Sequence, residues 1–281
     1  MNSIMYGLLA ALGWGSGDFV GGIASRKTGA YRAVFYGELV GVIFLLLILV
    51  FIPEPFPDTH TLTFSAIAGF LGTFGLIFLY QSMTLGLMSI AAPVSALLAV
   101  TIPVIVGMVT DGIPEYLTII GFGFAIFAVW NISQSEDGIK DILSHLSDLK
   151  LPLLAGIGFG TYFVLMHEAT ANGGVIWPMM LARLGGMVMI TAYMFISQSP
   201  WKVTDKSAWP IITLNGILDV SGNLFFILGS QVGRLDVVAV LSSLFPGATV
   251  LWALIFLKEH LSRRQWVGIF SALTAIVLLT I

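Results

Sequence analysis

The chain has 281 residues, of which 57% are hydrophobic and only 10% are charged. Soluble domains average about 45–50% apolar and about 25% charged residues, so this composition is that of a membrane protein. The net charge of −3 offers no basic patch for nucleic acid. The absence of cysteine excludes disulfides, thiolate metal sites and iron–sulfur clusters. We therefore expect the lipid bilayer to be the main partner of this chain.

Ten apolar runs follow one another along the chain, each close to the roughly 20 residues that a helix needs to cross a bilayer. Short polar breaks separate them, which predicts an all-α polytopic membrane protein. The predicted spans are 3–24, 31–52, 62–83, 89–110, 115–132, 151–168, 175–197, 209–230, 236–257 and 264–281. The first run lacks the basic flank of a signal peptide, so we expect it to remain as a span.

The longest polar segment, residues 133–150, is too short to hold a soluble catalytic domain. Its apolar residues recur at helical spacing: Ile139, Ile142, Leu143, Leu146 and Leu149. This pattern predicts a short amphipathic connector that lies flat at the membrane interface. The connector divides the chain into two five-helix blocks, 1–132 and 151–281.

The two blocks repeat one another. The segments "LLAALGWG" (8–15) and "LLAGIGFG" (153–160) match at five of eight positions, at an offset of 145. Further glycines match at an offset of 147: Gly69 with Gly216, Gly86 with Gly233 and Gly121 with Gly268. Five helices are an odd number, so the second block enters the bilayer from the opposite side. Inverted repeats around a central cavity are typical of transporters. The alternative is that two apolar blocks match by composition alone.

Several of these segments also carry a family resemblance. They are "GWG" in the first span, its echo "GFG" in the sixth, and the closing stretch 241–273. That stretch contains Pro246, an acidic turn at Glu259, and then Gln265, Trp266 and Gly268. In these features the chain resembles the EamA-type branch of the drug/metabolite transporter superfamily.

The resemblance implies ten helices in two inverted five-helix repeats around a central cavity, without implying one substrate. The first half departs from the pattern, because Asp111 and Gly112 stand where the second half has Lys258 and Glu259. The acidic turn is therefore not repeated, and no role is assigned to it.

The basic residues give an orientation. Ten of the twelve flank the loops that follow odd-numbered spans: Arg26, Lys27, Arg32, Lys140, Lys150, Lys202, Lys206, Lys258, Arg263 and Arg264. Only Arg234 flanks a loop on the other side, and Arg183 lies within a span. Lysine and arginine in short loops favour the cytoplasm, which predicts that both termini lie outside a prokaryotic cell membrane. Relatives in the resembled family are usually drawn with cytoplasmic termini, and we follow the charges.

Four ionisable residues lie within predicted spans: Asp18, Glu38, Arg183 and Asp219. A charged side chain near a helix centre costs about 2.5–3.5 kcal/mol on the insertion scale, so such residues face a cavity or a partner. Glu38 and Arg183 occupy equivalent positions, but straight helices would separate them in depth by about 8 Å. We therefore expect Arg183 to pair with Asp219 or with an anionic group of the substrate, rather than with Glu38.

The eighth span carries a polar stripe, because Asn215, Asp219 and Asn223 follow one another at four-residue steps. The equivalent residues of the third span are Ala68, Gly72 and Leu76. A stripe confined to one repeat suits an asymmetric ligand. The alternative is that these side chains only hydrogen-bond a neighbouring helix.

The first span has a comparable face, on which Trp14 precedes Asp18 by one helical turn. Trp14 is expected either to stack on a ligand or to pack in the bundle. Asp18 and Glu38 lie toward the same side, and two nearby carboxylates in an apolar site favour uptake of a proton by one of them. We therefore predict that Asp18 is a proton-coupling or cation-binding site, with Glu38 as its modulator.

Other chemistry is scarce. The sequence contains no HExxH, GxSxG, GxGxxG or P-loop spacing, so we expect no cofactor, no metal site and no enzymatic activity. Prolines within spans are expected to bend helices or free carbonyl groups: Pro93, Pro103, Pro178 and Pro246. Nothing indicates a homodimer.

These features predict a secondary active transporter that moves a small organic metabolite by alternating access and is coupled to protons. The substrate stays open between an amino-acid-like solute, a sugar and an organic cation. A membrane-embedded enzyme acting on lipid is an alternative, but it would need a clustered catalytic set. A channel is another, but it would need a filter loop or a ring of charges.

Overall fold

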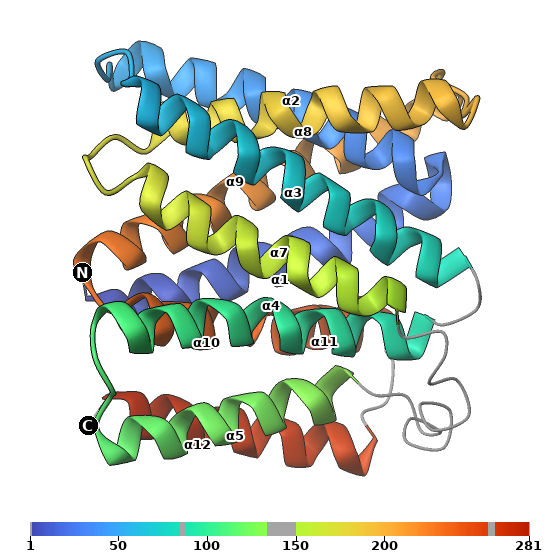
Figure 1. The fold of residues 1–281 in the computed structure, drawn as a ribbon. Coiled ribbons are helices and arrows are strands. Elements are labelled where there is room, and N and C mark those ends of the chain that lie inside the picture. The colour runs from blue at the N-terminus through green and yellow to red at the C-terminus, as the bar shows by residue number, and fades with distance from the viewer. Residues whose placement is uncertain (1, 85–87, 134–149, 258–261, 281) are drawn as a thin grey trace.

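The computed structural model describes residues 2–84, 88–133, 150–257 and 262–280, and these residues form helices and short connections without a strand (Figure 1). The predicted all-α class is therefore confirmed for the described residues. The predicted interfacial connector falls almost entirely on residues 134–149, which lie outside the described residues.

The helices occur where the apolar runs predict them, with ends that differ by at most four residues. The first half contains α1 (Ser3–Thr28), α2 (Ala30–Phe51), α3 (Thr59–Thr84), α4 (Met88–Thr110) and α5 (Tyr116–Ser133). The second half contains α7 (Lys150–Ala169), α8 (Ile176–Ile196), α9 (Trp209–Val232), α10 (Leu235–Ser242), α11 (Phe245–Trp252) and α12 (Arg263–Thr280). A short 3₁₀ turn, η2 (Lys206–Ala208), precedes α9, and a π-helical turn, η3 (Ala253–Leu257), follows α11.

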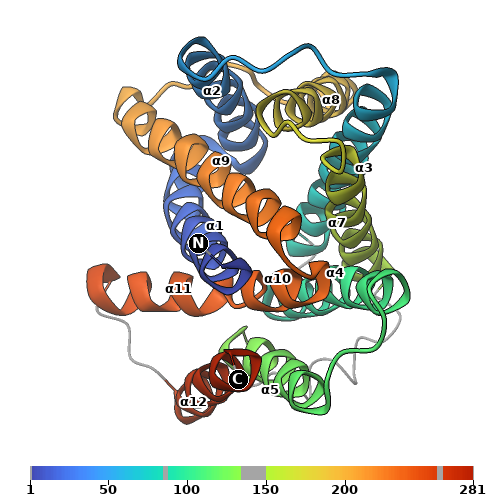
Figure 2. The same cartoon turned by 90° about the vertical axis from the view of Figure 1, so that its left-hand side faces the viewer.

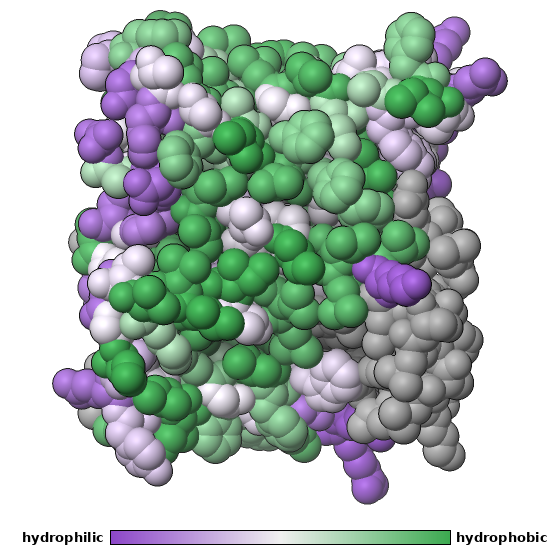
Figure 3. Space-filling model, in the orientation of Figure 1, coloured by the Kyte–Doolittle hydropathy of each residue, from purple (hydrophilic) through white to green (hydrophobic). Residues whose placement is uncertain are grey.

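Within the described residues, six helical segments are long and apolar enough to cross a membrane: Ala30–Phe51, Thr59–Leu79, Lys150–Ala169, Ile176–Ile196, Lys206–Val232 and Leu235–Phe256. Two shorter apolar helices cover Ser95–Thr110 and Tyr116–Ile132. The surface seen in Figure 3 has an apolar belt across its middle, with polar side chains gathered toward the two ends of the helices. The chain is an integral membrane protein by these criteria.

Successive helices alternate in direction, except that α11 continues the course of α10, so that the other connections gather at two ends of the bundle (Figure 1). At one end the α1–α2 connection meets the segment before α9, where Lys27 Nζ lies 3.9 Å from Asp205 Oδ2. At the other end the α9–α10 connection meets the α4–α5 connection, where Arg234 Nη1 donates to the Asp111 carbonyl at 3.0 Å. The described basic residues thus follow the two-sided segregation that the sequence predicts.

The closest helix pairs each combine one helix from each half: α1 with α9, α3 with α7, and α5 with α12. Seen end-on, α5 and α12 lie together at the edge of the bundle, apart from the other helices (Figure 2). The remaining described helices therefore form the body in which an internal site can lie.

Matched glycines set the spacing of these pairs. A Cβ atom on Gly13 would lie 2.8 Å from Gly222 Cα, and one on Gly158 would lie 2.9 Å from Gly75 Cα. The two contacts are related by the sequence offsets, since 13 + 145 is 158 and 75 + 147 is 222. Two further pairs of contacts obey the same offsets: Gly216 with Gly37 and Gly69 with Ala182, Gly268 with Ile132 and Gly121 with Leu279. The glycines repeat because equivalent helices of the two halves approach each other closely at equivalent places.

The ninth predicted span is not one continuous helix. It is split at Ser243 and Leu244 into α10 and α11, with the π-helical turn η3 completing it. Pro246 lies in the first turn of α11, where its missing N–H leaves no hydrogen bond unmade. The Thr249 hydroxyl donates at 3.0 Å to the carbonyl of Gly15, which ties the broken segment to α1. The hydropathy pattern could not reveal this break, because both pieces are apolar.

Candidate functional site

Arg183 is the centre of an ion-pair network inside the bundle. Its Nη1 donates to Glu38 Oε2 of α2 at 2.7 Å, and its Nη2 donates to the Asp219 carboxylate of α9. The side chain is only 8% exposed. A Cβ atom on Gly41 would lie 2.7 Å from Nη1, so this glycine makes room for the guanidinium. One buried cation therefore joins three helices through two carboxylates.

This geometry settles one expectation and corrects another. The predicted pairing of Arg183 with Asp219 is confirmed. The expectation that Glu38 stays away from Arg183 is wrong, because the two side chains form a salt bridge. The depth estimate assumed upright helices and side chains level with their Cα atoms. Helices in bundles tilt, and the long arginine side chain spans the remaining distance.

The polar stripe of α9 is partly joined to this network. Asn223 Nδ2 donates to the Asp219 carbonyl at 2.8 Å and to its carboxylate Oδ2 at 3.2 Å. Asn223 Oδ1 in turn accepts from the Tyr162 hydroxyl of α7 at 2.8 Å. Asn223 thus hydrogen-bonds a neighbouring helix. For this residue of the stripe, the structure favours the alternative of interhelical hydrogen bonding.

Asn215 lies apart from these bonds. Its amide rests against glycines of α1 and α2, since a Cβ atom on Gly21 would lie 2.9 Å from its Oδ1 and one on Gly37 would lie 3.3 Å from its Nδ2. Within the described residues it has no hydrogen-bond partner. Its amide therefore has a donor and an acceptor that no described residue uses.

Asp18 is an exposed residue on the inner face of α1. Met5 and Leu12 are 50% and 48% exposed and mark the outer face of α1. At about 100° per residue, Asp18 points about 120–140° away from both of them. The residue is exposed although protein surrounds it. It therefore lines an accessible space within the bundle, and in the part of the chain that the structure describes it has no ion-pair or hydrogen-bond partner.

The charged neighbour of Asp18 is Asp219, not Glu38 as we expected. The two helices are close at this level, because a Cβ atom on Gly17 would lie 3.6 Å from the Asp219 backbone nitrogen. The Asp219 side chain is 42% exposed, whereas that of Glu38 is 23% exposed and bound to Arg183. Two acidic side chains from facing helices thus border the accessible space.

Trp14 belongs to an aromatic cluster. Its ring lies 5.2 Å from Phe163, 5.6 Å from Phe226 and edge-on to Phe245 at 6.4 Å, measured between ring centroids. These contacts support a packing role for Trp14. One turn beyond Asp18 on the other side, Gly22 is exposed, with nothing within 4 Å of a Cβ position. Trp14 therefore lies against apolar rings on one side of Asp18, and the surface of α1 is open at Gly22 on the other.

Tyr162 is the member of this site that the sequence argument missed. It follows "GFG" at the position equivalent to Gly17. The change from glycine to tyrosine between the two repeats is therefore the sequence feature that could have indicated this residue. Tyrosine is common in membrane helices, so its presence in an apolar run does not by itself indicate a functional site. Among the described residues, no group of three or more histidine, aspartate or glutamate side chains has the arrangement of a metal site.

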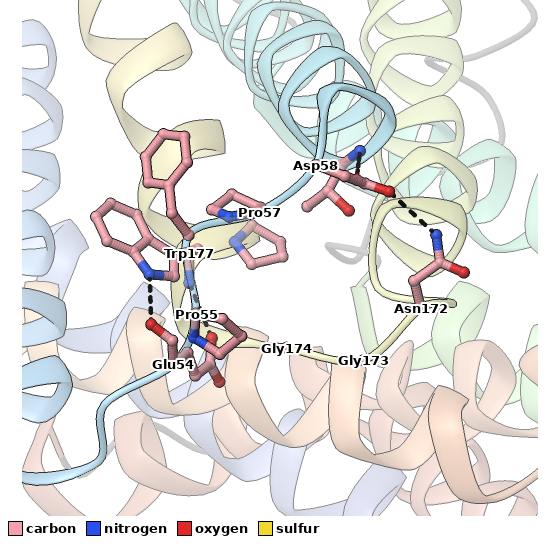
Figure 4. Close-up of a pocket in the computed structure, with 11 residues that line it drawn as sticks. Glu54, Pro55, Pro57, Asp58, Asn172, Gly173, Gly174 and Trp177 are labelled. Carbon is pink, nitrogen blue, oxygen red and sulfur yellow. Dashed lines mark hydrogen bonds between the residues drawn. The ribbon is translucent and has the colours of Figure 1, made fainter.

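A second polar feature lies at one end of the bundle, where the α2–α3 connection meets the α7–α8 connection (Figure 4). The Glu54 carboxylate accepts from the backbone N–H groups of Val175, Ile176 and Trp177 at 2.9–3.3 Å, and so caps the N-terminus of α8. A pocket of about 260 Å³ lies beside it. The backbone N–H of Thr61 lowers the pKa of Asp58, which caps α3. This feature ties the two halves together outside the apolar belt.

Two of the relatives of known sequence align with nearly the whole chain, and a third aligns with less than half of it. A "Putative sugar uptake protein" from Enterococcus faecalis is 21% identical over 273 residues, which are 94% of this chain and 92% of that protein. One of the same description from Listeria monocytogenes is 24% identical over 98% of this chain and 96% of its own. An uncharacterized protein from Methanocaldococcus jannaschii is 33% identical over 124 residues, which are 44% of this chain and 88% of that protein.

A solved crystal structure shares the fold, with a TM-score of 0.79 and 14% sequence identity over 98% of this chain and 95% of the other. The EamA-like transporter family matches the chain twice, over residues 1–134 and 148–281. These matches agree with the repeated "GWG" and "GFG" segments and cover nearly the whole sequence. The protein belongs to the EamA-like transporter family.

Proposed function

We propose that the protein is a secondary active transporter that moves a neutral, polyhydroxylated solute of the sugar class by alternating access, with proton coupling at Asp18. One observation carries the proposal: the Asp18 carboxylate faces an accessible space inside an apolar bundle and has no partner there among the described residues. Keeping such a group in the membrane is costly, and ion and substrate pathways are where it is usually found.

The architecture proposed for this function is ten membrane-crossing helices in two inverted five-helix repeats. Support comes from the alternating helix directions, from the odd number of predicted spans in each half, and from the offset-related glycine contacts. Transporters of this design place their substrate near the bilayer midplane, between the repeats. The ion-pair network and Asp18 lie between α1 and α2 of the first half and α8 and α9 of the second.

The charge distribution narrows the substrate class. An amino-acid-like solute would need a cation for its carboxylate, but Arg183 is buried and holds two carboxylates already. The groups left facing the space are the acceptors of Asp18 and Asp219 and the amide of Asn215. Hydroxyl groups both donate and accept, so they satisfy all three, whereas an ammonium group would leave the amide N–H unpaired. The names of the relatives from Enterococcus faecalis and Listeria monocytogenes point the same way.

Two other activities fit less well. An enzyme acting on lipid needs a nucleophile or general base set near one membrane face. The titratable groups described here instead form a central ion-pair network. A channel would conduct without saturation, and counterflow exchange separates it from a carrier.

Uptake and exchange measurements test the proposal. We expect hexoses or pentoses to raise the unfolding temperature of the purified protein, and to show saturable counterflow in proteoliposomes. Amino acids should do neither. Asn215→Leu, which keeps the size of the side chain and removes its amide, should raise the KM for the sugar. Saturable exchange of an amino acid with no sugar response would show that the substrate assignment is wrong.

We also propose that the end of the bundle with Lys27 and Lys202 faces the cytoplasm, because the basic residues gather there. The chain has no cysteine, so single substitutions can be labelled without background. Pro55 and Thr204 are both exposed, and they belong to the α2–α3 and α8–α9 connections, which lie at opposite ends of the bundle (Figure 1). In intact cells an impermeant thiol reagent should label Pro55→Cys and leave Thr204→Cys unlabelled. The reverse pattern would invert the orientation.

A further inference from the structure

Several contacts between the two halves are repeated at equivalent positions, but the contact at the polar site is not. Between α1 and α9, Gly17 faces Asp219 across the helix interface. The equivalent residues between α7 and α3 are Tyr162 and Gly72, by the offsets of 145 and 147. There the order of large and small residues is reversed. A Cβ atom on Gly72 would lie 3.0 Å from Tyr162 Cδ2, so the tyrosine ring lies directly over this glycine.

The tyrosine reaches from this equivalent place into the polar site. Its hydroxyl donates to Asn223 Oδ1 at 2.8 Å, and Asn223 Nδ2 donates to Asp219 Oδ2 at 3.2 Å. Because its Oδ1 is held, the Asn223 amide presents its N–H₂ group to Asp219 rather than its oxygen. The Asp219 Oδ2 atom thereby accepts from both Arg183 and Asn223, and the two donors together hold the carboxylate in place.

We propose that Tyr162 is a positioning residue of the transport site, with two effects that follow from one side chain. Its ring fills the space between α7 and α3 that corresponds to the α1–α9 site, so that a single asymmetric site is formed. Its hydroxyl orients Asn223, and through it the carboxylate that borders the substrate space. The inference rests on the proposed function, because it assigns Asp219 to substrate contact.

A double-mutant cycle on Tyr162 and Asn223 tests the positioning role. Tyr162→Phe keeps the ring and removes only the hydroxyl, so folded yield should be retained. The KM for sugar uptake should rise about 5–10-fold, the size expected for a lost hydrogen bond linked to a charged group. In the Asn223→Ala background the same change should have little further effect, because the hydroxyl acts through the asparagine. Equal, additive effects on KM would overturn the positioning role.

A substitution in α3 can change the position of the Tyr162 hydroxyl without altering Tyr162 itself. Gly72→Ala should displace the tyrosine ring and raise KM in the wild-type background, but not in the Tyr162→Phe background. Gly123→Ala is the matched control, because nothing lies within 4 Å of its Cβ position. An unchanged KM in Gly72→Ala, with the protein folded, would contradict the inference.

The two proposals can fail separately. The unfolding temperatures of the four proteins in the Tyr162 and Asn223 double-mutant cycle can also be compared, and this measurement requires no substrate. Coupling between Tyr162 and Asn223 in unfolding, with no sugar uptake by the wild-type protein, would overturn the proposed function. Sugar uptake by the wild-type protein with additive effects on KM would overturn the positioning role alone.

Discussion

Arg183→Leu should destabilise the protein strongly and abolish transport. Removing one member of a buried ion-pair network leaves the other charges unpaired, at a cost of about 3–5 kcal/mol. Here both Glu38 and Asp219 would lose their cation. Unfolding temperature and the yield of monodisperse protein in detergent measure the first effect, and uptake into proteoliposomes measures the second.

Two matched variants separate charge from geometry at this position. Arg183→Lys keeps the charge but cannot hold two carboxylates with a planar fork, so we expect intermediate stability and weak transport. The triple variant Arg183→Leu, Glu38→Gln, Asp219→Asn removes all three charges and should recover stability without recovering transport. If Arg183→Leu were as stable as the wild-type protein, the ion pairs would not be part of the folded structure in the membrane.

Asp18→Asn should leave stability unchanged or slightly raised and should uncouple transport from the proton gradient. The carboxylate forms no ion pair or hydrogen bond among the described residues and is repelled by Asp219, so its loss removes no favourable contact. A pH difference of one unit is worth about 1.4 kcal/mol per proton, which supports about tenfold accumulation. The variant should lose that accumulation and its pH dependence while retaining counterflow exchange.

The control for Asp18 is Asp205→Asn, an equal change at an extramembrane position near Lys27. It should transport as the wild-type protein does. Gradient-driven uptake with unchanged pH dependence in Asp18→Asn would rule out the coupling role and leave Asp18 as a substrate contact.

The ion-pair network shows where sequence reasoning reached its limit. The sequence predicts a functional role for Asp18, Glu38, Arg183 and Asp219, because charges within apolar runs are costly wherever the chain folds. Which of them meet depends on helix tilt and crossing, which no local pattern encodes. The pairing of Arg183 with Glu38 and the proximity of Asp18 to Asp219 therefore came only from the structure. Their roles in coupling and substrate binding remain predictions.

Trp14 and Tyr162 illustrate the same limit for aromatic residues. From sequence, Trp14 suited stacking on a ligand and packing equally well, and only its ring contacts with Phe163 and Phe226 show that it packs. Tyr162 looked like one more aromatic residue of a membrane helix until its hydroxyl was found on Asn223.

By itself, the sequence determined the membrane class, the places of the helices, the two-repeat family and the segregation of basic residues. These properties depend on hydropathy, glycine spacing and charge, which can be read from short stretches of the sequence without knowing how the helices pack. The tertiary structure decided the break between α10 and α11, the partners of Arg183 and the inward exposure of Asp18. Each of these is set by contacts between helices far apart in the chain, where a shift of a few ångströms changes which polar groups meet.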